Sequence, residues 1–147
     1  MAATATRDQI ELLANRYGEA WNACDVRGIL ALHAPDSVFH VHGAGDAAIG
    51  AEAVRGALEA FYSVWREPHF AERRLLLAED HWVLEWTLSA RAAGMISGDG
   101  VSVEAHRVRV SFEGVDVITV RDGLVAAKDV YIDALAVQRQ LEEAADA

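Results

Sequence analysis

Apolar residues recur every three or four positions through the first part of the chain, which is the spacing of amphipathic helices. Three stretches show this spacing, at residues 10–21, 25–32 and 54–65, and a capping-box sequence precedes the first. Pro35 and Pro68 follow the second and third stretches, so both helices are predicted to end before a proline. The pattern therefore predicts three helices, the first of about five turns.

Strand-like patterns interrupt the helices once and then dominate from residue 69 onward. A short strand is predicted at residues 37–42, followed by a small, glycine-containing loop. Longer strands are predicted at residues 69–78, 81–91, 101–120 and 124–132, the last two joined by the tight turn Arg121-Asp122-Gly123. Asp133 then caps a final helix. Helices first and a hairpin-rich sheet afterwards predict an α+β domain with helices on one face of a curved antiparallel sheet.

The strand at residues 101–120 carries a carboxyl group on its apolar side. The face that contains Asp116 is otherwise formed by His106, Val108, Val110, Phe112, Gly114, Ile118 and Val120, whereas Arg107, Arg109, Ser111 and Glu113 are on the other face. A lone buried carboxylate is costly, so Asp116 is expected to be partnered, protonated or directed into a cavity. A bulge at Glu113-Gly114 is the alternative, because it would turn Asp116 outward.

Composition narrows the class of protein. The 147 residues are 52% hydrophobic and contain no Pro/Gly/Ser-rich linker, so a single domain spanning residues 1–147 is expected. The formal net charge is −10 and the basic residues are scattered, which argues against nucleic acid and anionic membrane surfaces as partners. Cys24 is the only cysteine, so no internal disulfide can form. Neither a spanning segment nor a signal peptide is indicated, and a cytoplasmic location is expected.

Several strings, taken in order, carry a family resemblance over nearly the whole chain. They are Arg16-Tyr17 with Ala20-Trp21-Asn22-Ala23-Cys24-Asp25, Leu30 to Asp36, Phe112 to Val120, and Val120-Arg121-Asp122-Gly123 with Tyr131-Ile132-Asp133. In this order and spacing the chain resembles the cone-shaped superfamily named after nuclear transport factor two, in its SnoaL-like polyketide cyclase and ketosteroid isomerase branch. The resemblance implies a curved antiparallel sheet with helices packed on its concave face.

The resemblance also implies site residues. Tyr17 and Asp116 match the tyrosine and the neutral aspartic acid that form the oxyanion hole of ketosteroid isomerases, where they donate hydrogen bonds to an enolate oxygen. The bases used by the isomerases and by SnoaL-type cyclases correspond to Val41 and Val130, which cannot take a proton. The residues of limonene-epoxide hydrolases would fall at Trp86, Leu88 and Val130, so that reaction is not expected.

His40 and His42 flank Val41 and share one side of the short strand. Either could serve as the missing base near neutral pH, or the two could bind a metal together with a third ligand such as His106. No third ligand lies at a diagnostic spacing, so no metal and no cofactor are predicted. The remaining interpretation of the two histidines is that both are hydrogen-bonded or on the surface. For Tyr17, the alternative is a core residue whose hydroxyl reaches solvent.

Aromatic residues are numerous enough to line a pocket for a ring-bearing ligand, although simple core packing explains them equally. The predicted ligand-binding residues are Phe61, Trp65, Trp82, Trp86 and Phe112, with Val41 and Val130. Asp133 is interpreted as a helix cap and Asp129 as a solvated residue.

These observations predict a cofactor-independent enzyme that abstracts a proton next to a carbonyl of a hydrophobic, cyclic compound, as an isomerase or cyclase. Tyr17 and Asp116 would stabilise the enolate, and His40 or His42 would be the base. The alternative is a non-catalytic ligand-binding or dimerisation module of the same fold. A homodimer is also predicted, through an apolar patch of Val101, Val103, Val115 and Val117 on the sheet.

Overall fold

The computed structural model describes residues 6–98 and 101–145, with the side chains of 94–98, 101–107 and 145 outside the description. The sequence Ser-Gly-Asp-Gly at residues 97–100 predicts a turn, and this stretch falls partly outside the described ranges. In chain order the elements are α1 (Arg7–Asn22), α2 (Val26–Ala31), β1 (His33–Val41), β2 (Ala48–Ile49), α3 (Ala51–Val64), β3 (Trp65–Leu77), β4 (His81–Gly98), β5 (Val101–Arg121), β6 (Leu124–Ile132) and α4 (Ala134–Ala145).

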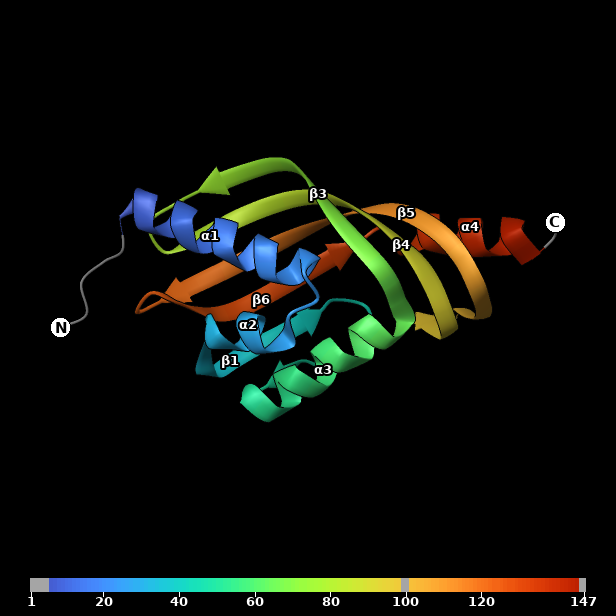
Figure 1. Cartoon of the computed structure of the whole chain (residues 1–147), viewed down its shortest axis with the longest axis horizontal. Coiled ribbons are helices and arrows are strands. Elements are labelled where there is room, and N and C mark those ends of the chain that lie inside the picture. The colour runs from blue at the N-terminus through green and yellow to red at the C-terminus, as the bar shows by residue number, and fades with distance from the viewer. Residues whose placement is uncertain (1–5, 99–100, 146–147) are drawn as a thin grey trace.

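The strands form one curved sheet with the order β2-β1-β6-β5-β4-β3. The sheet curves around α1 and α3, and α4 lies at its far end beside β5 (Figure 1). This arrangement confirms the predicted α+β class. The sheet is mixed and not purely antiparallel, because β1 pairs in parallel with β6. A parallel pair requires a long crossover connection, and here the chain between β1 and β6 supplies it.

The capping box predicted at the start of α1 is present. The Thr6 Oγ1 accepts a hydrogen bond from the Gln9 backbone N–H at 3.2 Å, and the Gln9 Oε1 accepts one from the Thr6 N–H at 2.8 Å. The helix buries the side predicted from the apolar spacing, formed by Ile10, Leu13, Tyr17 and Trp21. Tyr17 and Trp21 are thus one turn apart on the face that meets the sheet.

Both prolines lie inside strands, whereas the sequence predicted that each would mark the end of a helix. α2 ends at Ala31, β1 already begins at His33, α3 ends at Val64 and β3 begins at Trp65. The β1–β6 register shifts between His33 and Val38, around Pro35, and the β3–β4 register shifts between Arg66 and His69, around Pro68. A proline has no N–H to donate to a ladder, so an irregular stretch of strand accommodates it. The short strand β2 was not expected from the sequence.

Asp116 faces the interior. The β4–β5 pairing is regular from Arg109 to Thr119, with Gly114 beside Trp86 and Asp116 beside Leu84. No bulge occurs at Glu113-Gly114, and Asp116 is only 5% exposed. The prediction that this carboxyl group lies on the buried face of the strand is confirmed. Gly114 is required here because a Cβ atom at this position would collide with the Trp86 ring.

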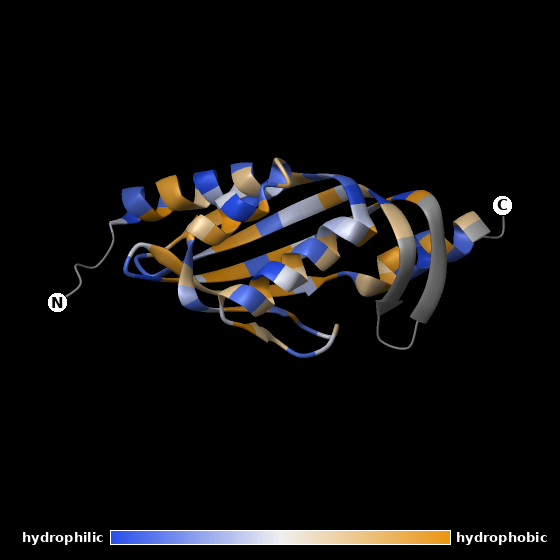
Figure 2. Cartoon of the chain, turned by 60° about the horizontal axis from the view of Figure 1, so that its bottom comes forward, coloured by the Kyte–Doolittle hydropathy of each residue, from blue (hydrophilic) through white to orange (hydrophobic). Residues whose placement is uncertain are grey.

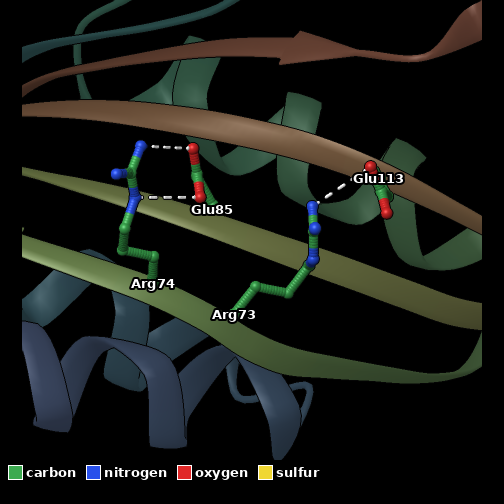
Figure 3. A network of polar contacts seen from close by, with 4 residues as sticks. All are labelled: Arg73, Arg74, Glu85 and Glu113. Carbon is green, nitrogen blue, oxygen red and sulfur yellow. Dashed lines mark hydrogen bonds and ion pairs between the residues drawn. The ribbon is translucent and has the colours of Figure 1, made fainter.

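The opposite face of the sheet carries charged side chains over β3, β4 and β5. Apolar and polar residues alternate along the strands (Figure 2), and Glu85 and Glu113 point away from the side that carries Trp86. The Arg74 guanidinium donates to both carboxylate oxygens of Glu85, at 2.8 and 3.1 Å, and Arg73 pairs with Glu113 at 3.1 Å (Figure 3). These exposed pairs link the three strands.

The homodimer patch is only partly described. Val115 and Val117 are half-buried on the outer face of the sheet, whereas the side chains of Val101 and Val103 lie outside the described residues. Dimerisation through this face stays a prediction. Within residues 6–98 and 101–145, no helix has the length and apolar character needed to cross a membrane.

Candidate active site

Two cavities lie between the helices and the sheet and share part of their walls. The larger has a volume of about 540 Å³ and the smaller about 180 Å³. Residues that line both are Trp21, Phe70, Trp86, Asp116 and Lys128. The larger volume is in the range that accommodates a small organic ligand. A buried charged pair therefore lies where the two cavities meet.

Each of the predicted ligand-binding residues, and Tyr17 as well, lines one of the cavities. The larger is lined by Val41, Phe61, Trp65, Trp86, Phe112 and Val130, and the smaller by Tyr17, Trp82 and Trp86. Several of these aromatic side chains also pack into the core, so the same residues both fill the core and line a cavity. That they bind a ligand stays a prediction.

Asp116 is paired with a lysine that was not singled out from the sequence. The Lys128 Nζ donates to the Asp116 Oδ2 at 2.9 Å, and both side chains are almost fully buried. The pairing follows from the sheet, because β5 and β6 are adjacent and the side chains of Ile118, Lys128 and Val130 share the inner face with Asp116. As an acceptor from an ammonium group, Asp116 does not match the neutral donor that the resemblance implies.

Aromatic rings surround the Lys128 ammonium group. Its nitrogen lies 4.1 Å from the centroid of the Trp21 ring and 5.2 Å from that of the Tyr17 ring, within the range of cation–π attraction. Burial lowers the pKa of Lys128, and the adjacent Asp116 carboxylate opposes this change. An ammonium group has three N–H donors, so Lys128 can donate to Asp116 and also to a ligand atom in the cavity.

Three buried polar atoms have no hydrogen-bond partner among the described residues: Trp21 Nε1, Trp86 Nε1 and Asp116 Oδ1. All three residues line both cavities. Buried polar groups are nearly always satisfied in folded proteins, so an unsatisfied one points to an ordered water, an ion or a catalytic role. The cavity walls thus offer two N–H donors and one carboxylate acceptor to a molecule bound there.

Tyr17 belongs to a buried chain of three hydrogen-bonding side chains. Its hydroxyl lies 2.7 Å from the His33 Nε2, and the His33 Nδ1 lies 2.9 Å from the Ser37 Oγ. Burial raises the pKa of Tyr17 well above its ordinary value, so the phenol keeps its proton. Burial, with a smaller effect of the Lys128 charge, lowers the pKa of His33 to about 4, so its imidazole is neutral at neutral pH.

The neutral imidazole gives this chain two hydrogen-bonding directions. In one, the Tyr17 hydroxyl donates to the His33 Nε2 and the His33 Nδ1–H donates to Ser37. In the other, Ser37 donates to His33, whose Nε2–H donates to Tyr17 and leaves the phenolic proton free for a ligand in the smaller cavity. Tyr17 can thus switch between accepting and donating without any charge being created in the core.

The structure does not place His40 where it could act on a ligand in the cavities. Its neighbours Phe39 and Val41 line the larger cavity, and His40 lies on the opposite face of β1. His42 follows the end of β1 and contributes to the rim of the larger cavity, but its Nε2 is paired with Asp129 at 2.7 Å. His40 therefore does not fit the predicted role of base, whereas His42 as the base stays a prediction.

Sequence reasoning missed His33, Ser37 and Lys128. Lys128 could have been found by the period of two, because it lies two residues before Val130, which was already assigned to the pocket. A buried acid also requires a nearby base, which points to the single lysine of the adjacent strand. Ser37 carries the same period-of-two signal, because it lies four residues before Val41 in the strand predicted at residues 37–42. His33 carries none, since it precedes that predicted strand and the start of β1 is irregular.

Comparison with known protein families identifies the family of this chain. A model of the SnoaL-like domain matches residues 14–128, most of the chain. The chain belongs to the SnoaL-like domain family. The resemblance inferred from the residue strings is thereby confirmed, and the curved α+β fold is shared with a solved SnoaL-like structure.

Solved structures similar to this SnoaL-like protein agree on the fold. TsrD from Streptomyces laurentii is 25% identical, with a TM-score of 0.76 over 92% of this chain and 96% of that one. A candidate SnoaL-like polyketide cyclase from Jannaschia sp. CCS1 is 19% identical, with a TM-score of 0.81 over 96% of both chains. TerC, crystallised with polyporic acid, is 18% identical, with a TM-score of 0.71 over 91% of this chain and 98% of that one. No curated protein matches the sequence.

Proposed function

We propose that this SnoaL-like protein is a cofactor-independent enzyme that abstracts a proton next to a carbonyl of a hydrophobic, cyclic compound. The observation that supports this most strongly is the buried Asp116 carboxylate, which uses Oδ2 to bind Lys128 and leaves Oδ1 without a partner in the described part of the chain. A carboxylate oxygen in a largely apolar cavity is suited to take a proton. Asp116 thus replaces the histidines as the proposed base.

The proposed reaction begins with transfer of a carbon-bound proton to the Asp116 Oδ1. The electron pair of the broken C–H bond delocalises onto the carbonyl oxygen, and the resulting enolate is stabilised by donors in the cavity wall. Lys128, Tyr17 and the two unpaired indole N–H groups are such donors. A fixed cation with several N–H groups in a water-poor site stabilises developing negative charge more than solvent water would.

Two outcomes follow from the same enolate. If Asp116 returns the proton to a different carbon of the conjugated system, the product is a double-bond isomer. If the enolate carbon attacks a second carbonyl of the same molecule, a carbon–carbon bond closes a ring and the proton passes to the new alkoxide. The similarity to a candidate polyketide cyclase favours the second outcome, and the cavity of about 540 Å³ favours a substrate with more than one ring.

The experiment is proton exchange of 2-tetralone in heavy water, followed by NMR. The ketone is cyclic and largely apolar, and its acidic protons exchange with deuterium only through the enolate. The purified protein is expected to accelerate the exchange above the buffer rate in proportion to its concentration. A panel of cyclic ketones that bind without accelerated exchange would overturn the proposal and favour the alternative, a ligand-binding module of the same fold.

A further inference from the structure

A second cluster of chemically active side chains, formed by His40, His42 and Asp129, lies at the end of β1, where His42 also reaches the rim of the larger cavity. The parallel register of β1 and β6 sets His40 beside Asp129 and Val41 beside Val130. His42 is two residues beyond His40, and its backbone N–H donates to the Val130 carbonyl at 2.9 Å. Side chains two positions apart share a face, so the two imidazoles and the carboxylate lie together. Asp129, expected to be solvated, is the third group that the sequence did not identify.

The three side chains are close enough to share one ion. One ligand atom from each of His40, His42 and Asp129 lies within 4.8 Å of the other two. Around a zinc ion bound at about 2.0–2.2 Å, ligand atoms are roughly 3.3 Å apart, so small side-chain rotations bring these three into place. We propose that His40, His42 and Asp129 form a binding site for a divalent transition-metal ion such as Zn²⁺, with solvent completing the coordination.

Neighbouring groups already hold both imidazoles. The His40 Nε2–H donates to the Gly45 carbonyl at 3.0 Å, which leaves the Nδ1 lone pair available. A bond from one ring nitrogen to a carbonyl is the usual support of a metal-bound histidine. The His42 ring lies between the His40 ring, with centroids 3.9 Å apart, and the Tyr131 ring, with centroids 4.3 Å apart and planes within 3°. The ligands therefore project from paired or adjoining segments in restrained orientations.

Ligand type and accessibility favour a transition metal. Two imidazoles and one carboxylate suit zinc, cobalt and nickel, whereas magnesium prefers a shell of oxygen atoms. The side chains of His42 and Asp129 are 31% and 37% exposed, so an ion can enter from solvent without unfolding. The ion would replace the proton that now joins the His42 Nε2 to the Asp129 Oδ1, and the net charge of −10 favours cation binding.

The site also borders the larger cavity from outside. Gly43, Ala44 and Asp46, in the segment after His42, line that cavity, and the Gly45 carbonyl is bonded to His40. A bound ion would hold the end of β1 together with this segment and so stabilise one wall of the cavity. The proposal is independent of the enzymatic one, because it involves neither Asp116 nor Lys128.

The test is calorimetric titration of tag-free protein, stripped with a chelator, with Zn²⁺ and with Mg²⁺. One Zn²⁺ per chain and no comparable Mg²⁺ binding are expected. Each of His40→Gln, His42→Gln and Asp129→Asn is expected to weaken Zn²⁺ binding about tenfold or more. Co²⁺ should give the visible absorption of a nitrogen-and-oxygen site with the wild type, and the triple variant should lose it.

The matched control is His81→Gln. His81 and Asp80 form a pair with the same 2.7 Å separation as His42 and Asp129, but within the described residues they belong to no group of three possible ligands. This variant should bind Zn²⁺ like the wild type. Absence of Zn²⁺ binding by the wild type, equal binding of Mg²⁺, or undiminished Zn²⁺ binding by a folded His40→Gln/His42→Gln/Asp129→Asn variant would each overturn the proposal.

Discussion

The Asp116 carboxylate and the Lys128 ammonium group form a 2.9 Å ion pair in the wall shared by the two cavities. Because both groups are buried, removing one leaves the other charge without compensation. Asp116→Val is therefore expected to lower the free energy of unfolding by about 3–5 kcal/mol, measured by chemical denaturation. The double variant Asp116→Val/Lys128→Met should recover most of that loss, since it removes both charges.

An exposed pair provides the control for this prediction. Arg74 and Glu85 form a bidentate ion pair, with two hydrogen bonds, on the outer face of the sheet (Figure 3). Glu85→Gln should cost at most about 1 kcal/mol, because solvent compensates the remaining charge. If Asp116→Val stabilised the protein, the buried pair would not exist in solution.

Tyr17→Phe is expected to change both ligand binding and stability. Loss of the hydroxyl leaves the buried His33 Nε2 without its 2.7 Å partner, which costs about 1–3 kcal/mol. It also removes a donor from the smaller cavity, so 2-naphthol, an analogue of an enol, should bind more weakly in a fluorescence titration. Tyr62→Phe is the control: its hydroxyl donates to the Trp21 carbonyl and lines neither cavity, so 2-naphthol binding should persist.

Burial of His33 makes the free energy of unfolding depend on pH. Its pKa is about 4 in the folded protein and about 6.5 in the unfolded chain, so the unfolded state binds more protons between these values. The free energy of unfolding should fall by roughly 3 kcal/mol from this residue as the pH drops from 6.5 to 4. Chemical denaturation at several pH values in this range should show that the free energy of unfolding of His33→Gln changes less with pH than that of the wild type. An unchanged slope would show that His33 is not buried in its neutral form.

Gly114→Ala tests the packing of Trp86 over β5. A methyl group at this position would collide with the indole ring and displace it from both cavity walls. The expected cost is about 1–3 kcal/mol, together with weaker 2-naphthol binding. Gly56→Ala on the exposed side of α3 meets no atom within 4 Å and should stabilise the protein by about 0.5–1 kcal/mol. Equal melting temperatures for the two variants would contradict this account.

Most of the fold could be predicted from the sequence because local periodicity and turn chemistry agree with the final packing. The capping box before α1, the Asp133 cap of α4 with its 3.0 Å bond from the Ala136 N–H, and the Asp-Gly hairpin all occur as predicted. The parallel pairing of β1 with β6 could not be predicted, because it joins strands that are distant in sequence and depends on the closure of the whole sheet.

The candidate site, like the fold, could be predicted from the sequence only in part. The inward direction of Asp116 follows from strand alternation, whereas its partner Lys128 depends on which strand lies beside β5. His40 and His42 were expected to lie on the same side of β1. Alternation along a strand shows which residues share a side, but it does not show which side meets the cavity. In the structure Phe39 and Val41 occupy that face, His40 lies on the other, and His42, at the rim of the larger cavity, is paired with Asp129.

The most direct test of the central claim compares proton exchange of 2-tetralone by the wild type and by Asp116→Asn, with binding of 2-naphthol measured on the same samples. Loss of the base should lower the exchange rate about 10²- to 10⁴-fold while the folded variant still binds 2-naphthol. Glu85→Gln should exchange at the wild-type rate. A folded Asp116→Asn variant that binds 2-naphthol and exchanges protons as fast as the wild type would contradict the assignment of Asp116 as the base.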